Sequence, residues 1–260
     1  MKIITCVKHV PTSALTPRIA DTRDRIEEEG LSFEVNEPDL YAIEEALHQR
    51  STLQGSVTAI TVGPGRAKEA LHVAYAKGVD HAVHVVDEAH RGANLYRSVK
   101  AIAEVAGKQG YDMIFTGIQA DDDLQGQFGI ALAEALAIPV VTAVTEISVH
   151  AQGKTVTVVR ELGEGYKEEL EVDLPCLITV QFGIRQLRYT PIMAIVKARA
   201  RKIESVNADA LGLSQADSGV GMRVIELSLP SDSGKCEMLD GTAPEMARTL
   251  IQKLVEAGIV

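Results

Sequence analysis

Residues 117–129 carry the pattern in this chain that is best suited to binding a ligand, because glycines, carboxylates and side-chain amides follow one another there. The segment follows the short apolar run Met113–Thr116 and leads into a stretch with helical spacing. Free backbone N–H groups at a helix start attract phosphate, and glycines allow a close approach to the backbone. The segment therefore predicts a phosphate site. The alternative is that Asp121–Asp123 only cap the helix, since three carboxylates repel a phosphate unless they point away from it.

Two other strand ends carry residues suited to the same site, Cys6–His9 after the first apolar run and Val62–Gly65 after the second. In an open parallel sheet, ligands bind outside the carboxyl ends of the strands near the topological switch point. We therefore expect the three segments to meet at one edge. The chain has no Walker A loop, no GxGxxG after a strand, and no CxxC, HExxH or GxSxG. His81 and His84 are three residues apart in a predicted strand, so they should face opposite sides and form no metal site.

The elements that position these segments alternate regularly from residue 1 to about residue 145. Apolar runs predict strands buried on both faces at Lys2–Val7, Val57–Val62, Ala82–Val86, Met113–Thr116 and Val140–Val144. Helical spacing occupies Leu40–Gln54, Arg66–Lys77, Leu95–Gln109 and Asp123–Ala137. Asp39 stands at the N-cap of the first helix, and Gly78 and Gly110 follow the second and third. The order predicts an α/β fold with a doubly wound, mostly parallel sheet and right-handed crossovers.

After about residue 145 the pattern changes. Strands are expected at Glu146–Val149 and Thr155–Arg160, around a turn at Gln152-Gly153, then at Glu168–Val172 and Cys176–Phe182. The turn Gly163-Glu164-Gly165 makes a β-hairpin, and Pro191 argues against one continuous helix in the basic stretch that follows. Residues 206–240 suggest an extended arm, and a terminal amphipathic helix is capped by Thr242. We expect an α/β domain over residues 1–205 and a C-terminal arm and helix over residues 206–260.

The composition excludes several classes of protein. The formal net charge is −10, there is no Trp, and aromatic residues make up only 4%, which argues against nucleic acid or an anionic membrane as a partner. The longest apolar runs are far short of the ~20 residues that span a bilayer, so no membrane insertion is expected. The N-terminus is typical of a first strand rather than a signal peptide. The separated Cys6, Cys176 and Cys236 suggest reduced, buried thiols in a cytoplasmic protein.

One block departs from the acidic average. Between Arg185 and Lys202 there are six basic residues and no acidic one, and the large side chains Tyr189, Ile192, Met193 and Ile195 lie among them. An exposed apolar tip ringed by cations is typical of a docking surface for an acidic partner. Nucleic-acid binding is the alternative for the basic side chains.

Seven segments together resemble the β subunit of electron transfer flavoprotein. They are Met1–Val10, Asn36–Leu47, Val62–Pro64, Gly78–Asp80, Gly117–Asp123, Val159–Pro175 and Arg188–Arg199. They follow in order over nearly the whole chain. Residues 159–179 are similar to the family signature, an Arg-Glu followed by a glycine turn, an acidic strand and a Pro before an apolar run.

The resemblance implies a heterodimer with an α subunit that holds a redox-active FAD. The dimer would carry electrons from flavin-dependent dehydrogenases to a downstream acceptor, so this chain would be a carrier subunit and not an enzyme. It further implies an AMP, or in bifurcating members a second FAD, in the domain of residues 1–205. The arm and helix would dock on the α subunit. Carried over position by position, the cofactor-binding residues are Cys6, Asn36, Glu37, Pro38, Asp39, Val62, Gly117, Ile118, Gln119, Ala120, Asp121, Asp122, Asp123, Leu124, Gln125, Gly126, Gln127 and Phe128.

The resemblance also implies residues that contact partners. The recognition loop of the family falls at Arg188–Val196, and its contact residues would be Arg188, Tyr189, Ile192, Met193 and Ile195, with Ile192 as the apolar anchor that inserts into a dehydrogenase. Glu161 matches a carboxylate that pairs across to the α subunit. The alternatives are that Ile192 packs against the α subunit and that Glu161 is a solvated charge at a strand end.

Three positions depart from the family pattern. Leu124 stands where an acid is common, Phe128 where a Thr is common at the phosphate turn, and Pro38 where an aromatic residue is frequent. Because Phe128 has no hydroxyl, phosphate binding would depend on backbone N–H groups, and the missing DGD pattern argues against the bifurcating branch. Two rival functions are an adenine-nucleotide-binding hydrolase and a ligand-sensing module of similar fold. The first needs a Ser/Gly-rich loop that is absent after the first strand, and the second needs neither a basic block nor a terminal helix.

Overall fold

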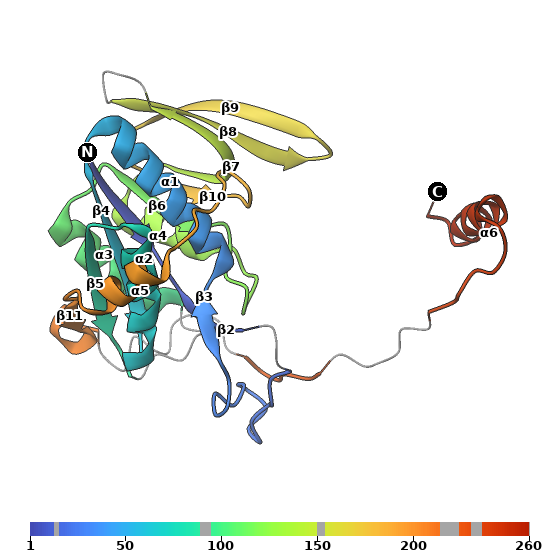
Figure 1. Cartoon of the computed structure of the whole chain (residues 1–260), viewed down its shortest axis with the longest axis horizontal. Coiled ribbons are helices and arrows are strands. Elements are labelled where there is room, and N and C mark those ends of the chain that lie inside the picture. Colours follow the sequence, from blue (N-terminus) through green and yellow to red (C-terminus); the bar gives the residue numbers. More distant parts are fainter. Residues whose placement is uncertain (13–15, 89–94, 150–153, 214–223, 230–235, 260) are drawn as a thin grey trace. The chain divides into compact units, whose positions relative to one another are not determined.

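The structure, a computed structural model, describes residues 1–12, 16–88, 95–149, 154–213, 224–229 and 236–259. It contains two compact units, Met1–Ile225 and Glu226–Val260 (Figure 1).

Nine strands of the described residues form one sheet in the order β11-β5-β4-β1-β6-β10-β7-β8-β9. Their bounds are β1 Lys2–Cys6, β4 Ser56–Gly63, β5 His81–Val86, β6 Met113–Gly117, β7 Val140–Val149, β8 Thr155–Gly163, β9 Tyr166–Asp173, β10 Cys176–Val180 and β11 Glu204–Asn207. Pairing is parallel from β11 to β7 and antiparallel from β7 to β9. The expected doubly wound, mostly parallel sheet with a β-hairpin is confirmed (Figure 1). A separate pair, β2 (His9–Pro11) with β3 (Phe33–Val35), was not expected.

Helices cover both faces of the central parallel strands, which explains why β5, β4, β1, β6 and β10 are largely apolar and buried. The helices of the first unit are α1 Glu37–Leu53, α2 Lys68–Lys77, α3 Leu95–Gln109, α4 Phe128–Leu136 and α5 Ile192–Arg199, and a 3₁₀ turn, η1 Gly65–Ala67, precedes α2. One core packs α1 and α2 against alternate strand residues such as Ile3 and Phe115. The other packs α3 and α4 against their neighbours Ile4 and Ile114. The left-handed Gly78 and Gly110 end α2 and α3 as expected.

Two helix starts differ from the expectation. α4 begins at Phe128 and not at Asp123, so residues 118–127 form a loop. α1 begins at Glu37, with Asn36 at the N-cap position and Pro38 in the first turn. Asp39 is therefore not the N-cap. It lies inside the first turn with a buried side chain.

The strands after residue 139 also differ in part. β7 is a single strand that spans both predicted runs, because a register shift lets it bend at Ala143 (φ 58°) and continue. The hairpin of β8 and β9 is confirmed, and the predicted turn Gln152-Gly153 lies outside the described residues. β9 is the outermost strand and carries Glu168, Glu169, Glu171 and Asp173. Pro191 directly precedes α5, so the basic stretch is not one helix.

The C-terminal arm is shorter than expected. β11 pairs with β5, and the 3₁₀ turn η2 (Ala208–Leu211) packs in the core of the first unit, so the division falls after Ile225 rather than after residue 205. In the second unit, α6 (Ala243–Glu256) begins with a capping box in which the Thr242 N–H donates to Glu245 Oε2 at 2.8 Å. The cap at Thr242 is confirmed. None of the residues of α6 is buried.

Among the described residues, no helix is long and apolar enough to cross a membrane. Cys6 and Cys176 are buried, and burial raises the pKa of Cys176 to about 12. Cys236 is exposed, so the expectation of three buried thiols is wrong there, because Cys236 lies outside the sheet core. His84 is buried with Nε2 3.0 Å from the Gly63 carbonyl oxygen, whereas His81 is exposed, so they do not share a face.

Candidate functional site

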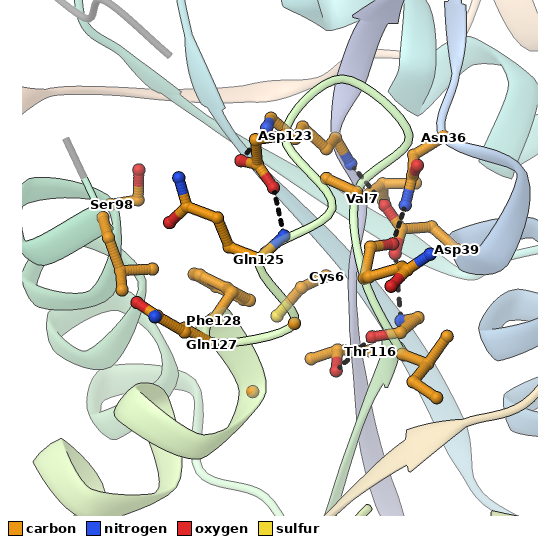
Figure 2. A pocket seen from close by; sticks show the side chains of 18 of the residues that line it. Cys6, Val7, Asn36, Asp39, Ser98, Thr116, Asp123, Gln125, Gln127 and Phe128 are labelled. Atoms are coloured by element: carbon orange, nitrogen blue, oxygen red, sulfur yellow. Dashed lines mark hydrogen bonds and ion pairs between the residues drawn. The ribbon is translucent and has the colours of Figure 1, made fainter. Parts of the chain in front are cut away.

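A cleft opens at the carboxyl end of β1 and β6, the topological switch point of the sheet (Figure 2). The space between its walls, together with the open solvent at its mouth, amounts to about 830 Å³. The three strand ends selected from the sequence meet here, since Cys6, Val62 and Gly117 all line the cleft. Their meeting follows from the parallel order β4-β1-β6, which brings the carboxyl ends of three strands together.

Most of the predicted cofactor-binding residues line this cleft. They are Cys6, Asn36, Asp39, Val62, Gly117, Ile118, Gln119, Ala120, Asp123, Gln125, Gly126, Gln127 and Phe128. Five others do not line it, namely Glu37, Pro38, Asp121, Asp122 and Leu124. The predicted set lacked Val7, Lys8, Leu95, Ser98, Ile102, Thr116 and Gly129. Leu95, Ser98 and Ile102 lie on one face of α3. Their helical spacing is visible in the sequence, but it does not indicate that this face borders the cleft.

Asp39 joins the two strand ends at the switch point. Its Oδ2 accepts from the Lys8 N–H at 2.8 Å, just after β1, and its Oδ1 accepts from the Gly117 N–H at 2.9 Å, at the end of β6. Burial raises the pKa of this carboxyl to about 7, although both backbone N–H groups favour the charged form. Asp39 therefore fixes the floor of the cleft rather than capping a helix (Figure 2).

Asn36 holds the start of the 118–127 loop against α1. Its Nδ2 donates to the Gln119 carbonyl oxygen and its Oδ1 accepts from the Asp121 N–H, both at 2.9 Å. In return, Asp121 Oδ2 accepts from the Glu37 N–H at 3.0 Å. The Asp121 carboxylate therefore caps α1, not α4.

Lys8 neutralises the other two acids of the loop. Its Nζ lies 2.5 Å from Asp122 Oδ1 and 3.0 Å from Asp123 Oδ2. Burial lowers the pKa of Lys8, but the two carboxylates more than offset it, so the pKa is raised. The sequence left open whether the three carboxylates would repel a phosphate. In the structure they are bound by α1 and Lys8. The idea that they cap the following helix is wrong, because α4 starts five residues after Asp123.

The N-terminus of α4 reaches the cleft without a side-chain cap. The N-cap residue Gln127 makes no side-chain capping hydrogen bond, and Gln127, Phe128 and Gly129 all line the cleft. Backbone donors at such a helix start favour an anion. Phe128 adds an apolar ring to the wall (Figure 2). Leu124 is left-handed (φ 52°) and 63% exposed, so the departure from the family at this position lies outside the cleft.

At two positions of the segment no residue larger than glycine fits, because neighbouring side chains pack against the backbone there. A Cβ on Gly117 would lie 2.5 Å from Pro38 Cβ, and one on Gly129 would lie 2.6 Å from Thr179 Cγ2. The close approach expected at these glycines is therefore made by α1 and β10.

Comparison with known proteins decides the family. The family model described as the electron transfer flavoprotein domain matches residues 25–211. The electron transfer flavoprotein subunit beta of Methylophilus methylotrophus is 31% identical over 261 residues and that of Thermoanaerobacterium thermosaccharolyticum 33% over 258 residues, each match covering 98% of both chains. The Caffeyl-CoA reductase-Etf complex subunit CarD of Acetobacterium woodii is 32% identical over 266 residues, 100% of both chains.

This chain belongs to the electron transfer flavoprotein family, as a β subunit. The resemblance seen in the sequence is confirmed. As a member of this family the chain has a role in electron transfer, and it is a carrier subunit rather than an enzyme in its own right.

The expected partner-contacting residues of this β subunit lie in two places. Tyr189 and Ile192 are 83% and 73% exposed, and Met193 and Ile195 are exposed beside them on α5. Glu161 is exposed near the tip of the hairpin, where it pairs in register with Lys167.

The basic block is only partly a rim of cations. Arg188 Nε lies 2.7 Å from Glu44 Oε2 and Arg185 Nε lies 2.7 Å from Glu45 Oε2, so both guanidinium groups bind α1. Arg201 donates to the carbonyl oxygens of Val79 and Asp80. These three arginines hold the fold together around α5. The one-sign block in the sequence is therefore balanced by acids and carbonyl groups elsewhere in the chain.

Proposed function

We propose that this β subunit forms a heterodimer with an α subunit that holds the redox-active FAD. The dimer carries electrons from flavin-dependent dehydrogenases to a downstream acceptor, and we place it in the cytoplasm. The observation that carries the proposal is the cleft at the switch point, whose polar groups are suited to holding a nucleotide. The family membership and the exposed apolar faces of α5 and α6 support it.

We propose AMP as the nucleotide in the cleft. The uncapped N-terminus of α4 offers backbone donors to a phosphate, and Lys8 already offsets the charge of Asp122 and Asp123. Val62, Leu95 and Ile102 supply apolar wall for an adenine, while Ser98 and Gln125 supply polar groups (Figure 2). Phe128 contributes its ring and its backbone N–H, so the missing hydroxyl is compatible with phosphate binding.

Two exposed surfaces are suited to the α subunit. Glu161, Leu162 and Tyr166 lie at the tip of the β8–β9 hairpin, where Leu162 and Tyr166 are exposed. On α6, Leu250, Ile251 and Val255 are exposed. Apolar groups left exposed on a single chain are typical of surfaces that a partner covers. We propose that both regions contact the α subunit.

The α5 helix is the proposed docking site for the dehydrogenase, with Ile192 as its anchor. An apolar side chain at the centre of an interface supplies most of its binding energy, whereas charges at the rim act on encounter. Lys197 and Arg199 supply such charges on the same helix.

The nucleotide content of the heterodimer tests the proposal. The chain is co-expressed with its α subunit, the purified dimer is denatured, and the released nucleotides are separated by chromatography. We expect one FAD and one AMP per dimer. Two FAD molecules would replace AMP by a second flavin and favour a bifurcating protein, and no second nucleotide would overturn the cleft assignment. The chain expressed alone as a well-behaved monomer with bound FAD would contradict the heterodimer.

A further inference from the structure

The α5 helix packs on α2, exposes most of its residues and is tied to the fold by polar contacts at its two ends. Of its eight residues only Ala198 is buried, and Ile192, Met193, Ile195 and Val196 are all exposed. A helix this short does not form by itself in water, so contacts with the rest of the fold must fix it. In Figure 1 it lies beside α2 on the face covered by α1 and α2.

Before α5, two buried carboxylates of α1 hold the chain: Glu45, which binds Arg185, and Glu44, which also reaches α2. Glu44 is 4% exposed, and it accepts from Arg188 Nε at 2.7 Å and from the Arg188 backbone N–H at 3.2 Å. It also accepts from Lys77 Nζ at 3.2 Å, at the end of α2. Arg188 Nη1 donates to the Lys77 carbonyl oxygen at 3.2 Å. Glu44 thus joins α1, α2 and the segment that enters α5.

After α5, the chain is tied to the end of α2 a second time. The guanidinium of Arg201 lies 3.9 Å from the centre of the Tyr75 ring and donates to the carbonyl oxygens of Val79 and Asp80. The Tyr75 hydroxyl donates to the Lys202 carbonyl oxygen at 3.0 Å. His72 Nδ1 lies 3.3 Å from the Ala198 carbonyl oxygen, within the last turn of the helix.

We propose that Glu44 and Arg201 are positioning residues that hold α5 ready for docking, an inference that rests on the docking role proposed above. Both residues lie outside α5, Glu44 in α1 and Arg201 after the helix, so neither belongs to the exposed apolar surface that would meet a partner. A helix fixed before the encounter loses less conformational freedom when it binds, so fixing it lowers the cost of association. Removing the charge of Glu44 leaves Lys77 and Arg188 without their buried charged partner. Of the two ion pairs described above between this segment and α1, only that of Arg185 then remains, so the entry to α5 is loosened.

The test uses the heterodimer with Glu44→Gln, assayed as electron acceptor for a flavin-dependent dehydrogenase chosen because it reduces the wild-type dimer. We expect KM for the dimer to rise about tenfold, the effect of losing one hydrogen bond to a charged group, with kcat unchanged. Hydrogen–deuterium exchange should become faster at the amides of Ile192–Arg199, while FAD and AMP contents stay the same. A loss of stability alone would leave KM unchanged for the folded fraction.

Two further variants complete the test. Tyr75→Phe removes only the hydroxyl that binds the Lys202 carbonyl and keeps the ring beneath Arg201, so it should raise KM in the same direction even if Glu44→Gln fails to fold. Arg66→Gln is the matched control, since its 2.9 Å ion pair with Glu28 lies at the other end of α2 and should leave KM unchanged.

The outcomes separate this inference from the docking role. If Ile192→Ala raises KM but Glu44→Gln and Tyr75→Phe do not, docking stands and the positioning role is overturned. If exchange in α5 becomes faster while KM stays constant, the positioning role is likewise overturned. If Ile192→Ala itself leaves KM unchanged, the docking role is wrong and this inference falls with it.

Discussion

The cleft and the α5 helix use charged side chains for the same purpose, although they present opposite surfaces. At the cleft, Lys8 and Asp39 hold strand ends and a loop so that backbone N–H groups and apolar walls face inward. At α5, Arg188 and Arg201 hold a short helix so that apolar side chains face outward. In both regions these charges act on the fold, and the groups proposed for direct contact with the phosphate or at the centre of the docking site are neutral. Charge patterns in this sequence therefore report scaffolding more than binding.

Gly117→Ala should have the largest effect, because a Cβ there would lie 2.5 Å from Pro38 Cβ and 2.6 Å from Asp39 Oδ1. We expect the free energy of unfolding to fall by about 3 kcal/mol, as for overpacking at a buried site. Urea denaturation of the heterodimer measures it. The control is Gly107→Ala in α3, where no atom lies within 4 Å of the added Cβ and where the change should be neutral or stabilising. Equal effects at the two glycines would contradict the tight contact between α1 and β6.

Asp39→Asn should have the next largest effect. The Lys8 and Gly117 N–H groups bind the two different carboxylate oxygens of Asp39, and an amide replaces one of these oxygens by an NH₂ group. We therefore expect the free energy of unfolding to fall by about 2 kcal/mol and bound AMP to be lost. The control is Asp112→Asn, since Asp112 accepts from the Lys2 N–H at 2.7 Å in an exposed position at the opposite end of β1. A larger loss at Asp112 would contradict the role of the buried carboxylate.

The pH dependence sharpens the same prediction. The pKa of Asp39 is raised to about 7 in the folded chain, so between about pH 4 and 7 the folded state binds more protons than the unfolded state. The stability that protonation of Asp39 gives to the folded state is therefore present at low pH and is lost as the pH rises to about 7. The stability difference between wild type and Asp39→Asn should shrink over that range and stay constant above it, as urea titrations at several pH values can show. A difference independent of pH would contradict the raised pKa.

Ile192→Ala should act on docking and leave the cleft untouched. Because the anchor is truncated, we expect the binding free energy between the dimer and the dehydrogenase to weaken by about 1–3 kcal/mol, which raises KM for electron transfer. The FAD spectrum and the stability of the heterodimer should stay unchanged. Ile130→Ala, an exposed isoleucine on α4, is the control. Intact turnover together with a dissociating heterodimer would mean that α5 packs against the α subunit.

Arg199→Glu should have the smallest effect. Arg199 ends α5 and is exposed, so a reversed charge should slow association with an acidic dehydrogenase about threefold at low salt and little at high salt. Stopped-flow reduction of the heterodimer at two salt concentrations measures it. A slower reaction that salt does not relieve would indicate a direct contact instead of a rim charge.

The sequence predicted the elements whose hydrophobic pattern decides them. The strands β1, β4, β5, β6 and β10 and the helix over residues 95–109 occur where the apolar runs and helical spacing placed them, because burial on both faces leaves little choice. The start of α4 was wrong because the partners of Asp121 and Asp122 lie in α1 and after β1, more than 80 residues away. The α3 face of the cleft and the pairing of β11 were missed for the same reason, since both depend on long-range packing.

The acidic outer strand has a consequence for the chain before it meets any partner. The unpaired edge of β9 is a template on which another chain could add a strand and so begin to aggregate. Glu168, Glu169, Glu171 and Asp173 place like charges along that edge, and a second copy of β9 laid beside it would bring those charges into opposition. We therefore expect the charges at this edge of the nine-stranded sheet to oppose pairing between two copies of β9 while the apolar hairpin tip and terminal helix are exposed.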